Sequence, residues 1–369
     1  MDQHAADHTD SSMASASAGR RRFLARAAGV AALAGAPQVW VRRSAAAGRV
    51  VVRTFGGAYE DALIKAVFHP YSKATGVDVV RVPATSTKLY AMLDAGKVEI
   101  DLLDTGEYGA LLLRQRGGLE RIDYQAFRLT DPADLDARDQ DMMGSIYYSN
   151  VLGYHTQAFP TGRHPRSWAE FWDLKRFPGP RMLADIGAGA VELEFALLAD
   201  GVPKDRLYPI DVERALRSMS RIRPAIKKFW DTGAISAQML ADKEVYAGSI
   251  WNGRIQTLID KGAPLAIEWN EALLQVQHWA ILKGSPNRDH AVRLIDFAMQ
   301  PAAQAELCRL IAYGPVNRKA IPLMTREELA KVPSNPDFVA RAIRHNVQWW
   351  ADNRQRFAER WAQWLLQRG

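Results

Sequence analysis

The stretch TFGGAYEDALIKAVFHPYSKATGVDVV, residues 54–80, decides the fold class of this chain. It follows the apolar run 50–52, which is typical of a buried strand. Its middle places Leu63, Val67 and Tyr71 on one side of a helix that Gly76 ends. A second apolar strand follows. Because two parallel strands need a long crossover between them, a strand–helix–strand order predicts a parallel sheet.

The same order continues with a helix over 85–97, a strand over 100–106 and a helix over 107–118. Beyond residue 141 the pattern is mixed, and strands and helices follow each other less regularly. We expect strands at 146–156, 180–183, 245–253, 265–270 and 273–284, and helices at 167–177, 191–201, 212–230, 254–263, 289–312, 325–332 and 336–369. The fold class is therefore α/β with parallel-rich sheets.

Composition limits the classes of protein. The chain has 369 residues, 48% of them hydrophobic, which is enough for two packed cores. The net charge of +7 includes a basic amino-terminal segment, and no Lys/Arg block indicates a nucleic-acid groove. The single cysteine, Cys308, cannot form an intrachain disulfide or a cysteine-based metal site alone. We expect no cofactor and no bound metal.

Residues 1–47 have the zones of an export signal rather than of a folded domain. GRRRFL resembles the twin-arginine motif, with Arg20 and Arg21 followed at the expected spacing by Phe23 and Leu24. A short apolar run and the small residues 44–47 complete the pattern. We expect export to the periplasm by the twin-arginine route.

Several ordered motifs carry a family resemblance. The 54–80 stretch, SWAEFWDLKRFPG, GSIWNGRIQTLIDKGAPLAI, HAVRLIDFAMQPAAQAEL and IAYGPVN together resemble the spermidine/putrescine-type periplasmic solute-binding proteins of ABC importers. The resemblance implies a two-lobed type II binding fold with crossovers near 151–154 and 277–280. Lobe 1 would be 48–152 plus 278–320, and lobe 2 would be 153–277 plus 321–369.

The candidate binding residues follow the strands, because ligands of open α/β sheets lie beyond the carboxyl ends of the strands. The loop after the first strand lacks the G-x-G-x-x-G or Gly-Lys-Ser/Thr signature of a phosphate site. Of the two neighbouring tyrosines at 147 and 148, we favour the first, since only one faces the site. From the loops and the resemblance together, the candidates are Phe55, Gly57, Tyr59, Thr85, Ser86, Thr105, Gly106, Tyr108, Tyr147, Asn150, Asp185, Glu192, Trp251, Arg254, Gln277 and Tyr313, with Asp104 as a further possibility.

The chain departs from the polyamine binders at one important place. Those proteins carry an acidic anchor for the cation in the strand before the second crossover, where this chain has Gln275, Gln277 and His278. A buried ammonium without a carboxylate partner costs several kcal/mol. An aromatic box still suits a polyamine-like or quaternary amine, while Arg254 and His278 would suit an aromatic carboxylate or a phosphonate. A ferric ion is a third alternative.

The expected activity is capture of a solute by closure of two lobes, followed by delivery to an ABC permease. The protein would act as a monomer and would not be an enzyme. An exported hydrolase and a non-transport sensor are the alternatives. The chain contains no Gly-x-Ser-x-Gly elbow and no His-Glu-x-x-His motif.

Overall fold

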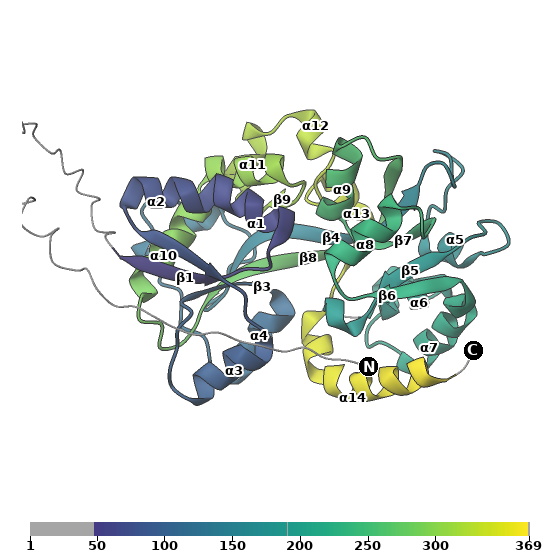
Figure 1. The fold of residues 1–369 in the computed structure, drawn as a ribbon, viewed down its shortest axis with the longest axis horizontal. Coiled ribbons are helices and arrows are strands. Elements are labelled where there is room, and N and C mark those ends of the chain that lie inside the picture. The colour runs from purple at the N-terminus through teal and green to yellow at the C-terminus, as the bar shows by residue number, and fades with distance from the viewer. Residues whose placement is uncertain (1–47, 190, 368–369) are drawn as a thin grey trace, which may run out of the picture. The chain divides into compact units, whose positions relative to one another are not determined.

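A computed structural model describes residues 48–189 and 191–367 (Figure 1). The predicted export signal, residues 1–47, lies outside the described part of the chain. Within that part, no helix has the length and apolar character needed to cross a membrane.

The stretch that decides the fold forms the predicted strand–helix–strand unit. Strand β1 (Arg49–Arg53) pairs in parallel with β2 (Asp78–Val82) on one side and β3 (Leu102–Gly106) on the other. The connecting helix has three consecutive parts, α1 (Gly57–Leu63), a π-helical turn (Ile64–Phe68) and α2 (His69–Thr75). Gly76 ends it with φ 72°, a left-handed conformation that glycine adopts without steric cost.

One mixed sheet contains the strands of the described residues, in the order β2-β1-β3-β8-β4-β7-β5-β6. Its two long central strands, β4 (Met143–His155) and β8 (Leu265–Ile281), run antiparallel to each other. The other elements are α3 (Ser86–Asp94), α4 (Glu107–Gln115), α5 (Trp168–Trp172), β5 (Arg181–Ala184), α6 (Leu193–Ala199), α7 (Val212–Ile222), β6 (Ile226–Trp230), α8 (Gly233–Ala241), β7 (Ala247–Trp251), α9 (Asn252–Asp260), α10 (Arg288–Ala298), α11 (Pro301–Leu310), β9 (Gly314–Pro315), α12 (Arg326–Leu329), α13 (Pro336–Arg341), β10 (Ile343–Arg344) and α14 (Val347–Leu366).

Several predictions about these elements were wrong. The helix predicted over 336–369 is divided into α13 and α14 by β10, and the helix predicted over 289–312 is two helices, α10 and α11. The helix predicted over 212–230 ends at Ile222, because Pro224 cannot continue it, and Ile226–Trp230 forms the edge strand β6 instead. Helix α8 was missed, since its apolar residues have little helical periodicity. The two strands predicted at 265–270 and 273–284 are one strand, β8, with an irregularity opposite β4 where Glu271 has φ 58°.

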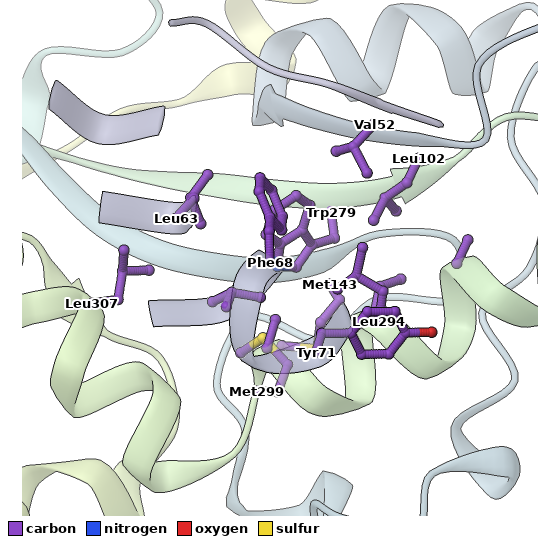
Figure 2. Packing of buried hydrophobic residues seen from close by; sticks show 14 of the residues in the cluster. Val52, Leu63, Phe68, Tyr71, Leu102, Met143, Trp279, Leu294, Met299 and Leu307 are labelled. Carbon is purple, nitrogen blue, oxygen red and sulfur yellow. The ribbon is translucent and has the colours of Figure 1, made fainter. Parts of the chain in front are cut away.

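The central strands separate two groups of hydrophobic cores. The first core packs α1, α2, α10 and α11 against β1, β3 and β8, with Phe68, Leu294 and Trp279 among its buried side chains (Figure 2). A second core gathers around Trp168 and Phe195 from α5 and α6. The carboxyl-terminal helix α14 belongs to this second core, where its tryptophans Trp350, Trp361 and Trp364 are buried.

Candidate functional site

Asp104, the middle residue of β3, is a buried polar residue beside the central strands. Its side chain is 0% exposed. One carboxyl oxygen, Oδ1, accepts a hydrogen bond of 2.9 Å from Gln277 Nε2 and one of 3.4 Å from the Tyr59 hydroxyl. The other oxygen, Oδ2, has no hydrogen-bond partner in the described residues. A buried acceptor of this kind costs about 1–3 kcal/mol unless a ligand satisfies it.

Burial raises the pKa of Asp104 to about 7. The amide of Gln277, the positive charge of Arg53 and the hydroxyl of Tyr59 oppose this rise in pKa, and the negative charge of Glu60 adds to it. Asp104 is therefore balanced between its neutral and ionised forms near neutral pH. A cation placed against Oδ2 would favour the ionised form.

Three tyrosines surround this carboxyl, and we call Asp104, Gln277, Tyr59, Tyr148 and Tyr313 the Asp104 cluster. The rings of Tyr59 and Tyr148 both pack edge-on against Tyr313, at centroid distances of 5.6 and 6.3 Å. Burial raises the pKa of Tyr313 to about 12, so its phenol stays neutral. The cluster thus offers one carboxyl and several ring faces, a combination that attracts an ammonium group.

Arg254 approaches the Asp104 cluster from α9, on the other side of the central strands. Its Nη1 lies 2.9 Å from the point that a Cβ on Gly57 would occupy. Glycine at position 57, with φ 67°, therefore makes room for the guanidinium. Arg254 Nε is buried and has no hydrogen-bond partner in the described part of the chain. Trp251, just before α9, packs edge-on against Trp230 at 5.3 Å and close to Gly233.

A second buried carboxyl, Glu192, is fully bonded. Its two oxygens accept hydrogen bonds from Asn150 Nδ2 at 2.7 Å, from the Ala184 backbone N–H at 2.9 Å and from the Ser249 hydroxyl. Asn150 in turn accepts from Gln275 Nε2 at 3.1 Å. We call these residues the Glu192 network. Glu192 and Asn150, which we expected to face the solute, instead join β4, β5, β7 and β8 in the interior.

Two further expectations about placement are corrected by the structure. The Asp185 carboxylate accepts a 2.7 Å hydrogen bond from Trp361 Nε1, so it holds α14. Tyr148, not Tyr147, lies in the Asp104 cluster. Tyr148 stands opposite Gln275 in the β4–β8 pairing and donates to its side chain at 3.3 Å, whereas Tyr147 stands opposite Val276 and points to the other face.

The remaining candidates have varied surroundings. Thr85 caps α3 by accepting from the Lys88 N–H, and Ser86 is exposed. The Thr105 hydroxyl points back toward Gly109 in α4, and Gly106 lies next to the Tyr148 hydroxyl, 3.7 Å from the point that a Cβ on it would occupy. The exposed ring of Phe55 lies under the Arg53 guanidinium, 3.8 Å from ring centroid to Cζ. The Tyr108 ring lies under Arg354 of α14 at 4.7 Å.

Sequence reasoning missed Arg53 and gave Asp104 only as a possibility. Each is a charged residue that follows apolar strand residues, in VVVR and LLDTG, and this was the available signal. A cavity of about 230 Å³ lies between the ends of α9 and α11, with Asp260, Lys261 and Arg309 in its lining. It contains no residue of the Asp104 cluster, which we consider the better candidate because a buried carboxyl oxygen of Asp104 lacks a partner.

Comparisons with known proteins agree with this architecture. Residues 66–340 match the family model described as bacterial extracellular solute-binding protein. The gamma-aminobutyric acid-binding protein of Pseudomonas aeruginosa is 33% identical over 324 residues, which cover 85% of this chain and 90% of that protein. The spermidine/putrescine-binding periplasmic protein of Escherichia coli is 24% identical over 298 residues, 76% of this chain and 82% of that protein.

Solved structures give the same result. An ABC transporter substrate-binding protein from Bradyrhizobium japonicum superposes with a TM-score of 0.80 at 34% identity, covering 87% of this chain and 100% of that one. A structure titled as the Atu4243–GABA receptor has a TM-score of 0.79 at 31% identity, covering 87% and 98%. The predicted two-lobed binding-protein fold is confirmed. The chain belongs to the family of bacterial extracellular solute-binding proteins.

Proposed function

We propose that this solute-binding protein of an ABC importer captures a small zwitterion, an ω-amino acid of the 4-aminobutyrate class. The ammonium group would bind the free oxygen of Asp104 between the rings of the cluster. The carboxylate would bind Arg254. The observation that carries the proposal is the pair of buried, unpartnered atoms, Asp104 Oδ2 and Arg254 Nε, on opposite sides of the central strands.

Tyr313 connects the two charged groups. Its ring lies 2.5 Å from the point that a Cβ on Gly253 would occupy, immediately before Arg254. Besides burial, which raises the pKa of Tyr313, the charge of Arg254 lowers that pKa and the charge of Asp104 raises it. Both charges are therefore close to the same phenol. A molecule with opposite charges at its two ends fits such a pair better than one with two equal charges.

This arrangement of charges fits a polyamine less well than a zwitterion. A diamine needs a second acidic group. Of the two carboxyls across the strands, Glu192 uses both oxygens within the protein, and Asp185 is bonded to Trp361 of α14. Arg254 would repel the second ammonium. The hypothesis that the solute is an ω-amino acid also agrees with the names of two relatives that are more than 30% identical to this chain.

Closure of two lobes would provide the mechanism. We assign 48–152 plus 278–320 to lobe 1 and 153–277 plus 321–369 to lobe 2, with one refinement. Met324 and Val332 pack with Cys308 of α11, so we move the last boundary to a point beyond Val332. The closed protein would then deliver its solute to the permease in the periplasm, after export by the twin-arginine signal.

A thermal-shift and calorimetry panel tests the proposed function. Purified protein is mixed with 4-aminobutyrate, putrescine, spermidine, glutamate and betaine. We expect 4-aminobutyrate to raise the melting temperature and to bind with a measurable Kd, and the two polyamines to do neither. Binding of putrescine as tight as that of 4-aminobutyrate would contradict the assignment of Arg254 to a carboxylate. Native mass spectrometry of freshly purified protein provides an independent identification of any retained solute.

A further inference from the structure

Arg53 occupies a position that solute binding alone does not explain. It ends β1 and is half buried. Its Nε donates to the carbonyl of Ala84 at 3.2 Å, and its Nη1 donates to the carbonyl of Asp104 at 2.8 Å. One guanidinium therefore links the carboxyl end of β1, the middle of β3 and the chain just beyond β2. Phe55 covers its face at 3.8 Å.

The charge of this guanidinium has no ion-pair partner within the part of the chain that the structure describes. Two backbone carbonyls and one ring face solvate it instead. A buried cation without a carboxylate partner is costly, and burial lowers the pKa of Arg53 while the nearby Asp104 raises it. The carboxyl that gains most from this charge is therefore Asp104.

We propose that Arg53 is a positioning residue for solute binding, which fixes the main chain of Asp104 and supplies the positive charge that keeps its carboxyl ionised for the solute's ammonium group. This inference rests on the proposed function, because it takes Asp104 as the ammonium anchor. It adds a residue that acts through Asp104.

The other groups around Asp104 do not supply this charge. Besides Arg53, the groups that act on its carboxyl are neutral or acidic: Gln277 from β8, and Tyr59 and Glu60 from α1. Tyr148 from β4 and Tyr313 from the segment after α11 are neutral neighbours, and the second cation near the cluster, Arg254 of α9, acts on Tyr313. Glu60 raises the pKa of Asp104 rather than lowering it. Among the groups that act on this carboxyl Arg53 is the cation, so its removal should be visible in the protonation of Asp104.

The alternative is that Arg53 has only a structural role and connects the strands through its hydrogen bonds. Two substitutions separate these roles. Arg53→Gln removes the charge and keeps a hydrogen-bond donor, whereas Arg53→Lys keeps the charge and loses the fork of donors. Arg49→Gln, at the exposed start of the same strand, serves as the matched control. If Arg53 has only a structural role, its substitution changes stability and affinity by the same factor at every pH. If its charge acts on Asp104, the substitution changes how stability and affinity depend on pH.

The experiment measures two quantities in the full-length mature protein. The first is the titration of Asp104 without solute, followed by its carboxyl signal in carbon-13 NMR and assigned with Asp104→Asn. The second is the Kd of 4-aminobutyrate between pH 6 and 9. In Arg53→Gln we expect the Asp104 midpoint to rise by about one unit and the affinity at pH 7 to fall about fivefold, with most of the loss recovered at pH 9. Arg53→Lys and Arg49→Gln should keep the wild-type midpoint.

The results overturn the inference if Arg53→Gln leaves the Asp104 midpoint unchanged, or if it lowers the affinity by the same factor at every pH. Failure of the wild-type protein to bind 4-aminobutyrate contradicts the proposed function instead. The titration without solute then still decides whether Arg53 acts on Asp104. The two proposals can therefore fail separately.

Discussion

Asp104 and Glu192 are two buried carboxyls on opposite sides of the central strands, and they differ in a single respect. Both are almost completely inaccessible, and burial raises the pKa of each to about 7. Glu192 uses both oxygens within the protein, whereas Asp104 leaves one oxygen without a donor. Burial and a raised pKa therefore do not identify a binding group here; the choice of Asp104 rests on its unused oxygen together with the tyrosine rings around it.

The difference follows from what each carboxyl joins. Glu192 precedes α6 and bonds to groups on β4, β5 and β7, so it satisfies donors that the sheet would otherwise leave unpaired. Asp104 lies in β3 beside tyrosine rings, and no donor of the described residues reaches its Oδ2. Glu192 thus stabilises the fold, and Asp104 retains an acceptor that a solute can use.

Exchange of each carboxyl for its amide gives the largest expected contrast. Asp104→Asn should weaken 4-aminobutyrate binding about 100-fold, because loss of one partner of a buried charge pair costs about 3 kcal/mol. Glu192→Gln should change the Kd less than about threefold while lowering the melting temperature. Calorimetry and thermal melts of both variants measure the contrast. Equal losses of affinity in the two variants would remove the distinction between binding and structural carboxyls.

The pH dependence of stability tests the burial that the two carboxyls share. Glu192 has a folded pKa of about 7 and an unfolded value near 4.5. Below pH 4.5 Glu192 is protonated in both the folded and the unfolded state, and its full contribution to folding stability is present. As the pH rises from 4.5 through about 7, the unfolded chain releases this proton before the folded protein does, so the contribution is lost. We expect the free-energy cost of Glu192→Gln to shrink by about 2 to 3 kcal/mol between pH 5 and pH 8. Urea unfolding without solute measures it, and a cost independent of pH would show that Glu192 ionises as it does in the unfolded chain.

Much of the fold followed from the sequence, because periodicity and turn residues act locally. The 54–80 stretch folds as predicted, and Gly76 ends its helix as predicted. Some of the errors involve long-range effects. No local pattern shows that Ile226–Trp230 would find β5 as a partner, or that β8 would pass through an irregularity at Glu271 without ending.

The site was harder to predict for the same reason. The sequence shows Gln277 where related polyamine binders have an acidic residue, and this suggested that an acidic anchor was missing. In the fold, β3 lies next to β8, and Asp104 of β3 reaches the side chain of Gln277. A carboxyl on one strand stands beside an amide on the next. Only the pairing of strands far apart in sequence brings this carboxyl to the cluster.

Two adjacent glycines test the approach of Arg254 to the cluster. Gly56 and Gly57 have φ values of 69° and 67°, so alanine at either position is strained by about 1–2 kcal/mol. A Cβ on Gly57 would meet Arg254 Nη1, whereas a Cβ on Gly56 would meet no atom within 4 Å. Gly57→Ala should therefore lower both stability and 4-aminobutyrate affinity, the latter about tenfold. Gly56→Ala should lower stability alone, and a similar affinity loss in both variants would assign the effect to loop strain.

The neighbouring tyrosines of β4 give the smallest expected effect. Tyr148 donates to Gln275 at 3.3 Å within reach of the cluster, and Tyr147 faces Arg318 and Arg344 on the opposite side of the strand. Loss of one neutral hydrogen bond costs about 0.5–1.5 kcal/mol, so Tyr148→Phe should weaken 4-aminobutyrate binding about two- to tenfold. Tyr147→Phe should leave the Kd unchanged. Since both variants keep the aromatic ring and the strand, calorimetry on this pair isolates one hydroxyl. A weaker Kd in Tyr147→Phe alone would restore the original choice of Tyr147 and would place the solute on the other face of β4.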